Sequence, residues 1–344
     1  MKRFPVMVFG GQAGHGDPGA EIASGFREMG WIVQEVNSRH YLGRTSGSIS
    51  RLLARFSRFK AGQTYRDDLL NVCNTLRPDV FLTVKGDFLT PELLEKIRKT
   101  GARTVNYYPD VDFDHPWLNK AVLGEFDLFC TTKRFQIPYL EERLGPGRAA
   151  YVPHGYSPSM IRPMYQGIAE DEYRTDVLYA GNHSFHKQEW LESLMLRHPG
   201  LGLDIIGGRW NERVASGPLA GCDFLGVRTS SSYAEALQTA KINIAVHFGK
   251  TKSGWEDMVS KRTFEIPACR GFMLHIDNEE VREFFEPGLE IDVFASPDEL
   301  ADKVRFYLQR PDLRASMIDR AYRRCVPAYS FRERARQIAE RLAL

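Results

Sequence analysis

Short runs of apolar and β-branched residues alternate with longer amphipathic stretches along most of this chain. The first runs are FPVMVFG, WIVQEV, VFLTV, TVNYY and LFCTT, and stretches such as TPELLEKIRKTG lie between them. Strands that alternate with helices form parallel βαβ units, because a parallel strand needs a long crossover to reach its neighbour. The alternation therefore predicts an α/β fold.

The alternation occurs twice. A proline-rich passage, YVPHGYSPSMIRPMYQ, is followed by a second set of strand-like runs: DVLYAG, LGLDIIGG, CDFLG, INIAVHF, GFMLHI and EIDVFA. A chain of 344 residues is also too long for one ordinary domain. We predict two Rossmann-like domains, residues 1–160 and 170–328, with the boundary between about Pro153 and Glu172. Loops at the carboxyl ends of the strands would then face each other across a cleft.

Charge and cysteine usage exclude several classes of protein. Lys and Arg total 46 against 44 Asp and Glu, so no basic surplus of the kind that nucleic-acid binding requires is present, and we expect no nucleic-acid partner. No window approaches the roughly 20 apolar residues that span a bilayer. The five cysteines are far apart and form no CxxC pair. This spacing favours a reducing, cytoplasmic location and neither a disulfide framework nor a structural metal.

The segment Ile49–Lys60, ISRLLARFSRFK, places apolar residues on one helical face and four cations on another. This pattern is typical of a helix that lies on anionic lipid. It also fits a buried apolar face with solvated arginines. Peripheral contact with the inner membrane face is therefore one of two interpretations.

A glycine-rich loop follows the first predicted strand, in GGQAGHGDPGAEI. Three of its glycines match G-x-G-x-x-G: Gly14, Gly16 and Gly19. With Glu35 about 20 residues on, the spacing resembles a dinucleotide fingerprint. However, Gly10 and Gly11 occupy the turn at the strand end, and Pro18 interrupts the motif. The loop is better interpreted as a flexible segment near Gly11 that lets a ligand approach the backbone, with a plain connection as the alternative.

Acidic residues gather after the strand that ends near Tyr107, in NYYPDVDFDHP. Asp110, Asp112 and His115 stand where a general base or a hydroxyl-binding carboxylate would lie. With Asp114 they also offer alternate carboxylates to a divalent metal. The Gly and terminal Glu of a calcium loop are missing, however. Contact with a sugar or an acceptor, a metal site and solvated loop acids all remain open.

A strand in the second half runs directly into Gly181 and Asn182, and a helix begins near Lys187. A phosphate could rest on exposed backbone N–H groups there, with Lys187 or His186 beside it. Ordinary helix capping by Asn182 or Ser184 is the alternative.

The segment SKRTFEIPACRGF places cations and a carboxylate at a predicted helix start. Lys261 or Arg262 can neutralise a diphosphate, and the positive end of the helix adds to that field. Glu265, one turn later, can accept hydrogen bonds from the two hydroxyls of a ribose. The segment therefore favours a nucleoside diphosphate, although Glu265 could simply complement the helix dipole.

These later motifs, in order, resemble the C-terminal half of the CgeB/YkvP-like glycosyltransferases, distant relatives of the large retaining family 4. The pattern R-x-F-E-x-x-A-C is matched by residues 262–269, and FEPG (285–288) and SPDEL (296–300) follow it. In the N-terminal half, PGAEIASGFREMGWIVQEV is similar to the glycine loop and first helix of these enzymes. YVPHGYSPSMIRP is similar to their interdomain passage.

The resemblance implies the GT-B architecture, with the donor nucleotide on the C-terminal domain and the acceptor on the N-terminal one. It also implies that a C-terminal helix, 329–344, packs back on the N-terminal domain. Glu265 would bind the ribose, and Arg262 with Lys187 would bind the diphosphate. Gly181 would leave room for the diphosphate. The family's sugar-binding acid falls at Asp257, and its N-domain histidine has its counterpart in the loop of Asp110 and His115.

From these features we predict a hexosyltransferase that moves a sugar from a nucleoside diphosphate to a hydroxyl acceptor: a glycan, a lipid, a protein or a small molecule. No cofactor or divalent metal is required if cations and helix dipoles meet the charge of the leaving diphosphate. A retaining reaction needs no strong side-chain base, whereas Asp110 or Asp112 would serve an inverting one. A nucleotide-sugar epimerase and a non-catalytic binding or assembly module on the same fold are the alternatives.

Overall fold

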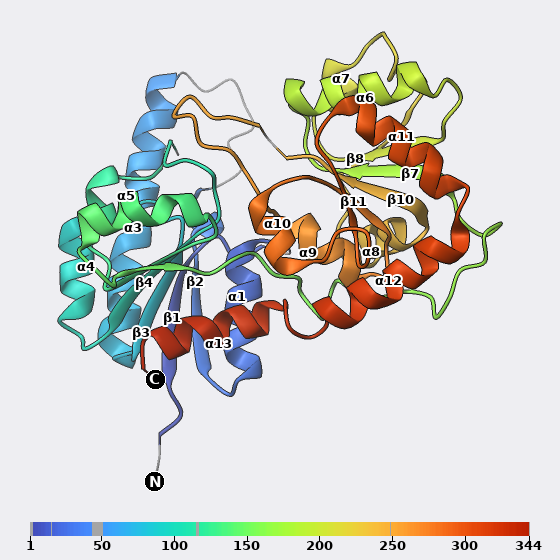
Figure 1. Ribbon diagram of the computed structural model, residues 1–344. Coiled ribbons are helices and arrows are strands. Elements are labelled where there is room, and N and C mark those ends of the chain that lie inside the picture. Colours follow the sequence, from blue (N-terminus) through green and yellow to red (C-terminus); the bar gives the residue numbers. More distant parts are fainter. Residues whose placement is uncertain (1–2, 15, 43–50, 115–116, 248, 344) are drawn as a thin grey trace. The chain divides into compact units, whose positions relative to one another are not determined.

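The computed structural model describes residues 3–14, 16–42, 51–114, 117–247 and 249–343, without the side chains of 42 and 51–59 (Figure 1). The chain divides into two compact units. Unit 1 comprises Met1–Pro153 and Phe331–Leu344, and unit 2 comprises His154–Ser330. Each unit contains one parallel six-stranded sheet with helices between its strands. The predicted α/β fold with two Rossmann-like parts is confirmed.

Unit 1 has the strand order β2-β1-β3-β4-β5-β6, so its order reverses between β1 and β3. The strands are β1 (Val6–Gly11), β2 (Ile32–Asn37), β3 (Val80–Val84), β4 (Arg103–Tyr108), β5 (Leu128–Thr131) and β6 (Ala149–Tyr151). Every residue of β3 and β5 is buried. This burial is expected where helices cover both faces of a parallel sheet.

The helices of unit 1 come from both ends of the chain. They are α1 (Pro18–Glu28), α2 (Arg39–Leu42), α3 (Arg51–Leu76), α4 (Pro91–Arg98), α5 (Ile137–Leu144) and α13 (Phe331–Arg341), with short 3₁₀ turns at Lys120–Gly124 and Arg134–Gln136. α13 lies against α1 (Figure 1). At Gly25 a Cβ atom would lie 2.7 Å from the carbonyl oxygen of Phe331, so a glycine permits this close approach.

Unit 2 has the strand order β12-β11-β10-β7-β8-β9, which places its first strand in the middle of the sheet. The strands are β7 (Thr175–Ala180), β8 (Leu203–Ile206), β9 (Asp223–Gly226), β10 (Ala240–Ala245), β11 (Met273–Ile276) and β12 (Asp292–Phe294). The helices are α6 (Phe185–Arg197), α7 (Trp210–Arg213), α8 (Ser230–Gln238), α9 (Lys261–Ala268), α10 (Glu279–Phe284), α11 (Pro297–Leu308) and α12 (Pro311–Cys325).

The strand order identifies one edge of each sheet, at the carboxyl ends of the strands, as the expected ligand-binding edge. Ligands of open α/β sheets bind at the carboxyl ends of strands, where the order reverses and neighbouring loops diverge. That place lies between β1 and β3 in unit 1 and between β7 and β10 in unit 2. Among the described residues, no helix is both long and apolar enough to cross a bilayer.

Candidate functional site

The first turn of α9 lies at the reversal point of unit 2. Its N-cap residue, Ser260, donates its backbone N–H to the hydroxyl of Thr263 at 3.2 Å, which fixes the start of the helix. Arg262 is the second residue of α9. Its guanidinium donates to the Tyr179 hydroxyl at 2.8 Å and to the carbonyl oxygens of Ala180 and Val246. The guanidinium thus bridges the ends of β7 and β10.

A glycine at position 181 is required by this arginine. A Cβ atom there would lie 2.3 Å from a guanidinium nitrogen of Arg262 and 2.7 Å from the hydroxyl of Tyr179. The sequence interpretation left the space above Gly181 for a diphosphate. In the structure Arg262 occupies that space, so the glycine positions the cation.

The loop after β7 is fastened to the loop after β8. Gly181 donates its N–H to Ile206 at 2.7 Å, and His183 donates to Gly208 at 3.1 Å. The side-chain oxygen of Asn182 accepts the N–H of Gly208 at 2.9 Å. These groups already have partners in the protein, so a phosphate would meet the side chains and the start of α6 instead of the N–H groups of Gly181 and His183.

Lys187 is a buried cation in the first turn of α6. Ser184 caps this helix, and the Lys187 ammonium donates to the carbonyl oxygen of Asn182 at 2.9 Å. The residue is only 7% exposed. Burial, reinforced by the charge of Arg262 and opposed by Asp257, lowers the pKa of Lys187 to about 7. Two cations therefore lie close together at the same sheet edge, an arrangement that an anion would stabilise.

Glu265 lies one turn after Arg262 and is 5% exposed. Its carboxylate accepts from the hydroxyl of Tyr233 at 3.2 Å and pairs with the ammonium of Lys261, also at 3.2 Å. Burial and then the carboxylate raise the pKa of Tyr233 well above its usual value, so this hydroxyl remains a donor. Lys261 and Arg262 lie in the first turn of α9 and Glu265 one turn later, as their spacing predicts, but the ammonium of Lys261 pairs with Glu265.

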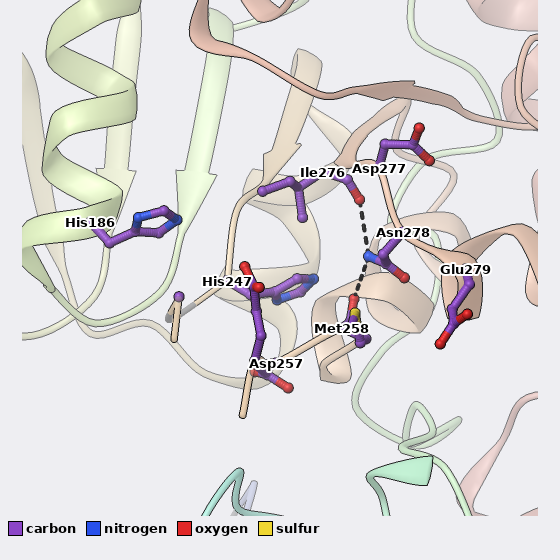
Figure 2. A pocket seen from close by; sticks show the side chains of 10 residues that line it. His186, His247, Asp257, Met258, Ile276, Asp277, Asn278 and Glu279 are labelled. Carbon is purple, nitrogen blue, oxygen red and sulfur yellow. Dashed lines mark hydrogen bonds between the residues drawn. The ribbon is translucent and has the colours of Figure 1, made fainter. Parts of the chain in front are cut away.

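A cavity of about 330 Å³ opens at the carboxyl ends of β10 and β11 (Figure 2). Its wall includes His186, His247, Gly249, Asp257, Asp277 and Glu279. The amide of Asn278 donates to Met258 at 2.8 Å and to Ile276 at 3.1 Å, and these bonds tie the loops after β10 and β11 together (Figure 2). Of the predicted site residues, Asp257 lines this cavity.

His247 and His275 are site residues that the sequence interpretation missed. Both are buried, and their Nε2 atoms lie 3.0 Å apart. Each histidine lies at or just beyond the carboxyl end of an apolar strand run, INIAVHF or FMLHI. That position was the available signal. Their contact depends on the pairing of β10 with β11, which no spacing along the chain reveals.

The acidic loop of unit 1 follows β4. Asp110 pairs with the ammonium of Lys85 at 2.7 Å. Lys85 follows β3 and has φ of 68°, a conformation that is rare for a residue with a side chain. The amide of Gln136 donates to the carbonyl oxygens of Asp110 and Val111, both at 3.1 Å. A substrate hydroxyl would therefore reach Asp110 beside Lys85 or by displacing it.

The other predicted residues of this loop have separate partners. Asp112 accepts from the N–H of Asp114 at 3.0 Å, and its carbonyl oxygen accepts from Tyr108 at 2.7 Å. Asp114 pairs with Lys120 at 2.8 Å. His115 lies outside the described residues. Within the part of the chain that the structure describes, no three His, Cys, Asp or Glu side chains form a group that could hold a metal ion.

The glycine loop of unit 1 is organised by a carboxylate. Asp17, the N-cap residue of α1, accepts the N–H of Gly14 at 2.7 Å and pairs with Arg39 at 2.8 Å. Glu35, the acid of the dinucleotide spacing, pairs with Arg27 of α1 at 2.5 Å. A dinucleotide ribose would have to replace Arg27 at Glu35.

Two further predictions concern unit 1. Gly11 ends β1, and its carbonyl oxygen accepts from the N–H of Ser38 at 2.9 Å. The amphipathic segment Ile49–Lys60 overlaps the start of α3, which begins at Arg51. Residues 49 and 50 and the side chains of 51–59 are not among those that the structure describes. The membrane contact of this segment remains a prediction.

Comparison with known proteins finds a family match that covers most of unit 2 and continues into α13. Residues 183–340, which include Lys187, Arg262 and Glu265, match the family described as glycosyl transferase-like. No curated protein matches the sequence.

Solved structures match almost the whole chain at low identity. Sucrose-phosphate synthase from Thermosynechococcus elongatus matches with a TM-score of 0.69 at 12% identity, over 99% of this chain and 98% of that one. AviGT4, a glycosyltransferase of avilamycin A biosynthesis, gives 0.67 at 15% identity over 98% and 97%. HepE of Anabaena, solved with UDP-glucose, gives 0.64 at 12% identity over 98% and 99%. The chain thus has the GT-B glycosyltransferase fold, and its residues 183–340 match the glycosyl transferase-like family.

Proposed function

We propose that this protein is a glycosyltransferase that binds a nucleoside diphosphate sugar on unit 2. The observation that carries the proposal is the pair of cations at the reversal point, Arg262 and Lys187, with the carboxylate of Glu265 one turn away. The family match spans all three residues. HepE, which has the same fold, was solved with UDP and with UDP-glucose.

The two cations suit the leaving group of such a reaction. When the glycosidic bond to a diphosphate breaks, negative charge builds on the departing phosphate. Fixed cations and helix N-termini stabilise that charge without reorganisation. Arg262 is held by carbonyl oxygens, and Lys187 by Asn182. A bound diphosphate would also favour the protonated form of Lys187. In this proposal the protein's own cations do the work of a metal.

Glu265 suits the ribose. Two vicinal hydroxyls need an acceptor that keeps its orientation, and Tyr233 and Lys261 hold this carboxylate. Asp257, on the wall of the 330 Å³ cavity, would accept hydrogen bonds from the transferred sugar. A cavity of this size falls within the range of about 300–1,000 Å³ typical of small-molecule sites.

The finer assignment rests on the sequence resemblance. We propose a CgeB/YkvP-like enzyme that transfers a hexose with retention of configuration. In a retaining reaction the leaving phosphate accepts the acceptor's proton, so no side-chain base is needed. In an inverting reaction Asp110 or Asp112 would be the base. The acceptor is a hydroxyl of a glycan, a lipid, a protein or a small molecule.

Calorimetric titration with UDP, GDP and ADP tests the proposal. We expect one of these nucleotides to bind the wild-type chain, and Glu265→Gln to weaken that binding about tenfold or more, because a charged acceptor is lost. Glu299→Gln, in the first turn of α11 of the same unit, is the matched control and should bind as the wild type does. Equal affinity of Glu265→Gln and the wild type would remove the ribose role. Incubation with the donor sugar alone would yield a new nucleotide sugar only from an epimerase.

A further inference from the structure

Two buried histidines, His247 and His275, lie next to Arg262 and have not yet been given a role. His275 is the third residue of β11, and His247 lies two residues beyond the end of β10. Their exposed fractions are 0% and 2%. Because buried polar groups need partners, the proton positions on these rings follow from the atoms around them.

The ring of His275 has one assignable form. Its Nδ1 lies 2.7 Å from the carbonyl oxygen of Ile276, which can only accept, so Nδ1 carries a proton. Burial lowers the pKa of His275 to about 4, so the ring is neutral near pH 7. Its Nε2 is therefore unprotonated and accepts hydrogen bonds.

The state of His247 follows from that of His275. Its Nε2 lies 3.0 Å from the accepting Nε2 of His275 and must donate. Its Nδ1 lies 3.5 Å from a nitrogen of the Arg262 guanidinium, which can only donate. Nδ1 is therefore the acceptor, and with the proton on Nε2 the ring is neutral. The pair thus presents an acceptor to the guanidinium, whereas a protonated His247 would present a positive charge.

A second branch ties the helix itself to His275. The hydroxyl of Thr263 lies 3.0 Å from the same Nε2 and also accepts the N–H of Ser260. Since Nε2 is an acceptor, the hydroxyl donates to it, and it shares the single lone pair of this nitrogen with the N–H of His247. His275 is therefore the shared acceptor for the start of α9 and, through His247, for the end of β10.

We propose that His247 and His275 are positioning residues: the neutral, ordered pair holds the guanidinium of Arg262 in place for the donor diphosphate. In its protonated form Lys187 repels the guanidinium of Arg262, so a nearby acceptor helps to hold that guanidinium. The carbonyl oxygens of Ala180 and Val246 fix two edges of the guanidinium, and His247 supplies an acceptor beside them. This inference rests on the proposed diphosphate site.

The proton positions can be measured directly. In ¹⁵N-labelled protein at pH 7, we expect His247 to carry its proton on Nε2 and His275 on Nδ1. Single substitutions of each histidine would assign the signals. A charged ring, or the opposite form of either one, would overturn the inference.

The affinity for pyrophosphate and UDP distinguishes a positioning role of His247 from a general effect on stability. We expect His247→Phe, which keeps a flat ring without the lone pair, to weaken binding of inorganic pyrophosphate and of UDP about 10- to 100-fold. In His247→Asn the side-chain oxygen takes the place of Nδ1, so most of the affinity should return. The control is His198→Phe, which removes a 2.9 Å contact with Ala301 beyond the far end of α6 and should leave affinity unchanged.

The outcomes distinguish the two proposals. If the wild-type chain binds neither pyrophosphate nor UDP, the proposed function fails. If it binds them and folded His247→Phe binds equally well, the positioning role fails while the function stands. If affinity is lost in His247→Phe and does not return in His247→Asn, the positioning role is also wrong. His275→Gln, whose side-chain oxygen replaces the accepting Nε2, should retain more affinity than His275→Phe.

Discussion

The carboxyl edges of the two sheets satisfy their buried polar groups differently. In unit 2, Arg262, His247, His275 and Thr263 form one connected set of contacts. In unit 1, the buried hydroxyl of Thr83 and both polar atoms of the Asn106 side chain have no hydrogen-bond partner among the described residues. Thr83 and Asn106 are register partners on β3 and β4. At the unit 2 edge these side chains thus form a connected set, whereas the two polar side chains of the unit 1 edge have no protein partner among the described residues and can be met by water or a ligand.

This difference suits two kinds of ligand. A diphosphate has a fixed shape and charge, so cations held by the protein bind it with little reorganisation. An acceptor hydroxyl is small and neutral and can be met by less constrained groups. The proposed division of labour, with the donor on unit 2 and the acceptor on unit 1, agrees with this contrast.

The largest expected effect comes from removing the bridging cation. Arg262→Met should weaken UDP binding by at least about 100-fold, because the strongest anion partner is lost and the carbonyl oxygens of Ala180 and Val246 lose their donor. Arg262→Lys should recover little, since one ammonium cannot reach both strand ends. Calorimetric affinity within twofold of the wild type for Arg262→Met would contradict the assignment.

Gly181→Ala tests the same cation through packing. The new methyl group would lie 2.3 Å from the guanidinium. We expect a loss of about 1–3 kcal/mol in unfolding free energy and a clear loss of UDP affinity. Gly221→Ala, where a Cβ would meet nothing within 4 Å, is the matched control. Equal behaviour of the two variants in denaturant unfolding and in UDP titration would show that Arg262 does not need Gly181.

The lowered pKa of Lys187 predicts that UDP affinity depends on pH. Its pKa of about 7 in the free protein should rise when a diphosphate binds, so binding takes up a proton above pH 7. UDP affinity should fall as pH rises from 7 to 9, by up to about tenfold per unit. Lys187→Met should bind more weakly at pH 7 and lose most of this slope. A wild-type affinity that rises over this range would contradict the assignment.

Threonine substitutions compare the two edges directly. Thr263→Val removes a donor to His275 and should lower the free energy of unfolding by about 1–2 kcal/mol. Thr83→Val removes a hydroxyl that has no protein partner among the described residues and should be neutral or stabilising. Denaturant unfolding measures both. Equal losses would remove the contrast between the edges.

The smallest expected effect is at Asp110. Its ion pair with Lys85 is partly exposed, so Asp110→Asn should cost less than about 1 kcal/mol of stability. In a retaining enzyme, the transfer rate should change by less than about tenfold. A loss of about 100-fold or more would identify Asp110 as a base and favour inversion.

The sequence predicts some levels of this structure and not others. Alternating runs are local, so the parallel α/β fold was predictable. The turn that holds Arg262 and Glu265 was predictable as well, because residues three apart share a helical face. Strand order was not, since the neighbours of β7 and β10 depend on how distant crossovers pack.

Contacts between distant segments were also beyond the sequence. The pairs His247–His275 and Lys85–Asp110 each join loops or strands that meet only in the folded sheet. The sequence indicated that Gly181 belongs to the site, but it assigned the free space there to a diphosphate. The neighbour of Gly181 is the side chain of Arg262, which enters from a helix 81 positions further on.

A crystal structure of the protein with UDP would test the central claim most directly. The account predicts the diphosphate against the guanidinium of Arg262 and the ammonium of Lys187, with the ribose hydroxyls on the carboxylate of Glu265. A nucleotide bound instead at the glycine loop before α1, with Arg262 and Lys187 untouched, would contradict it.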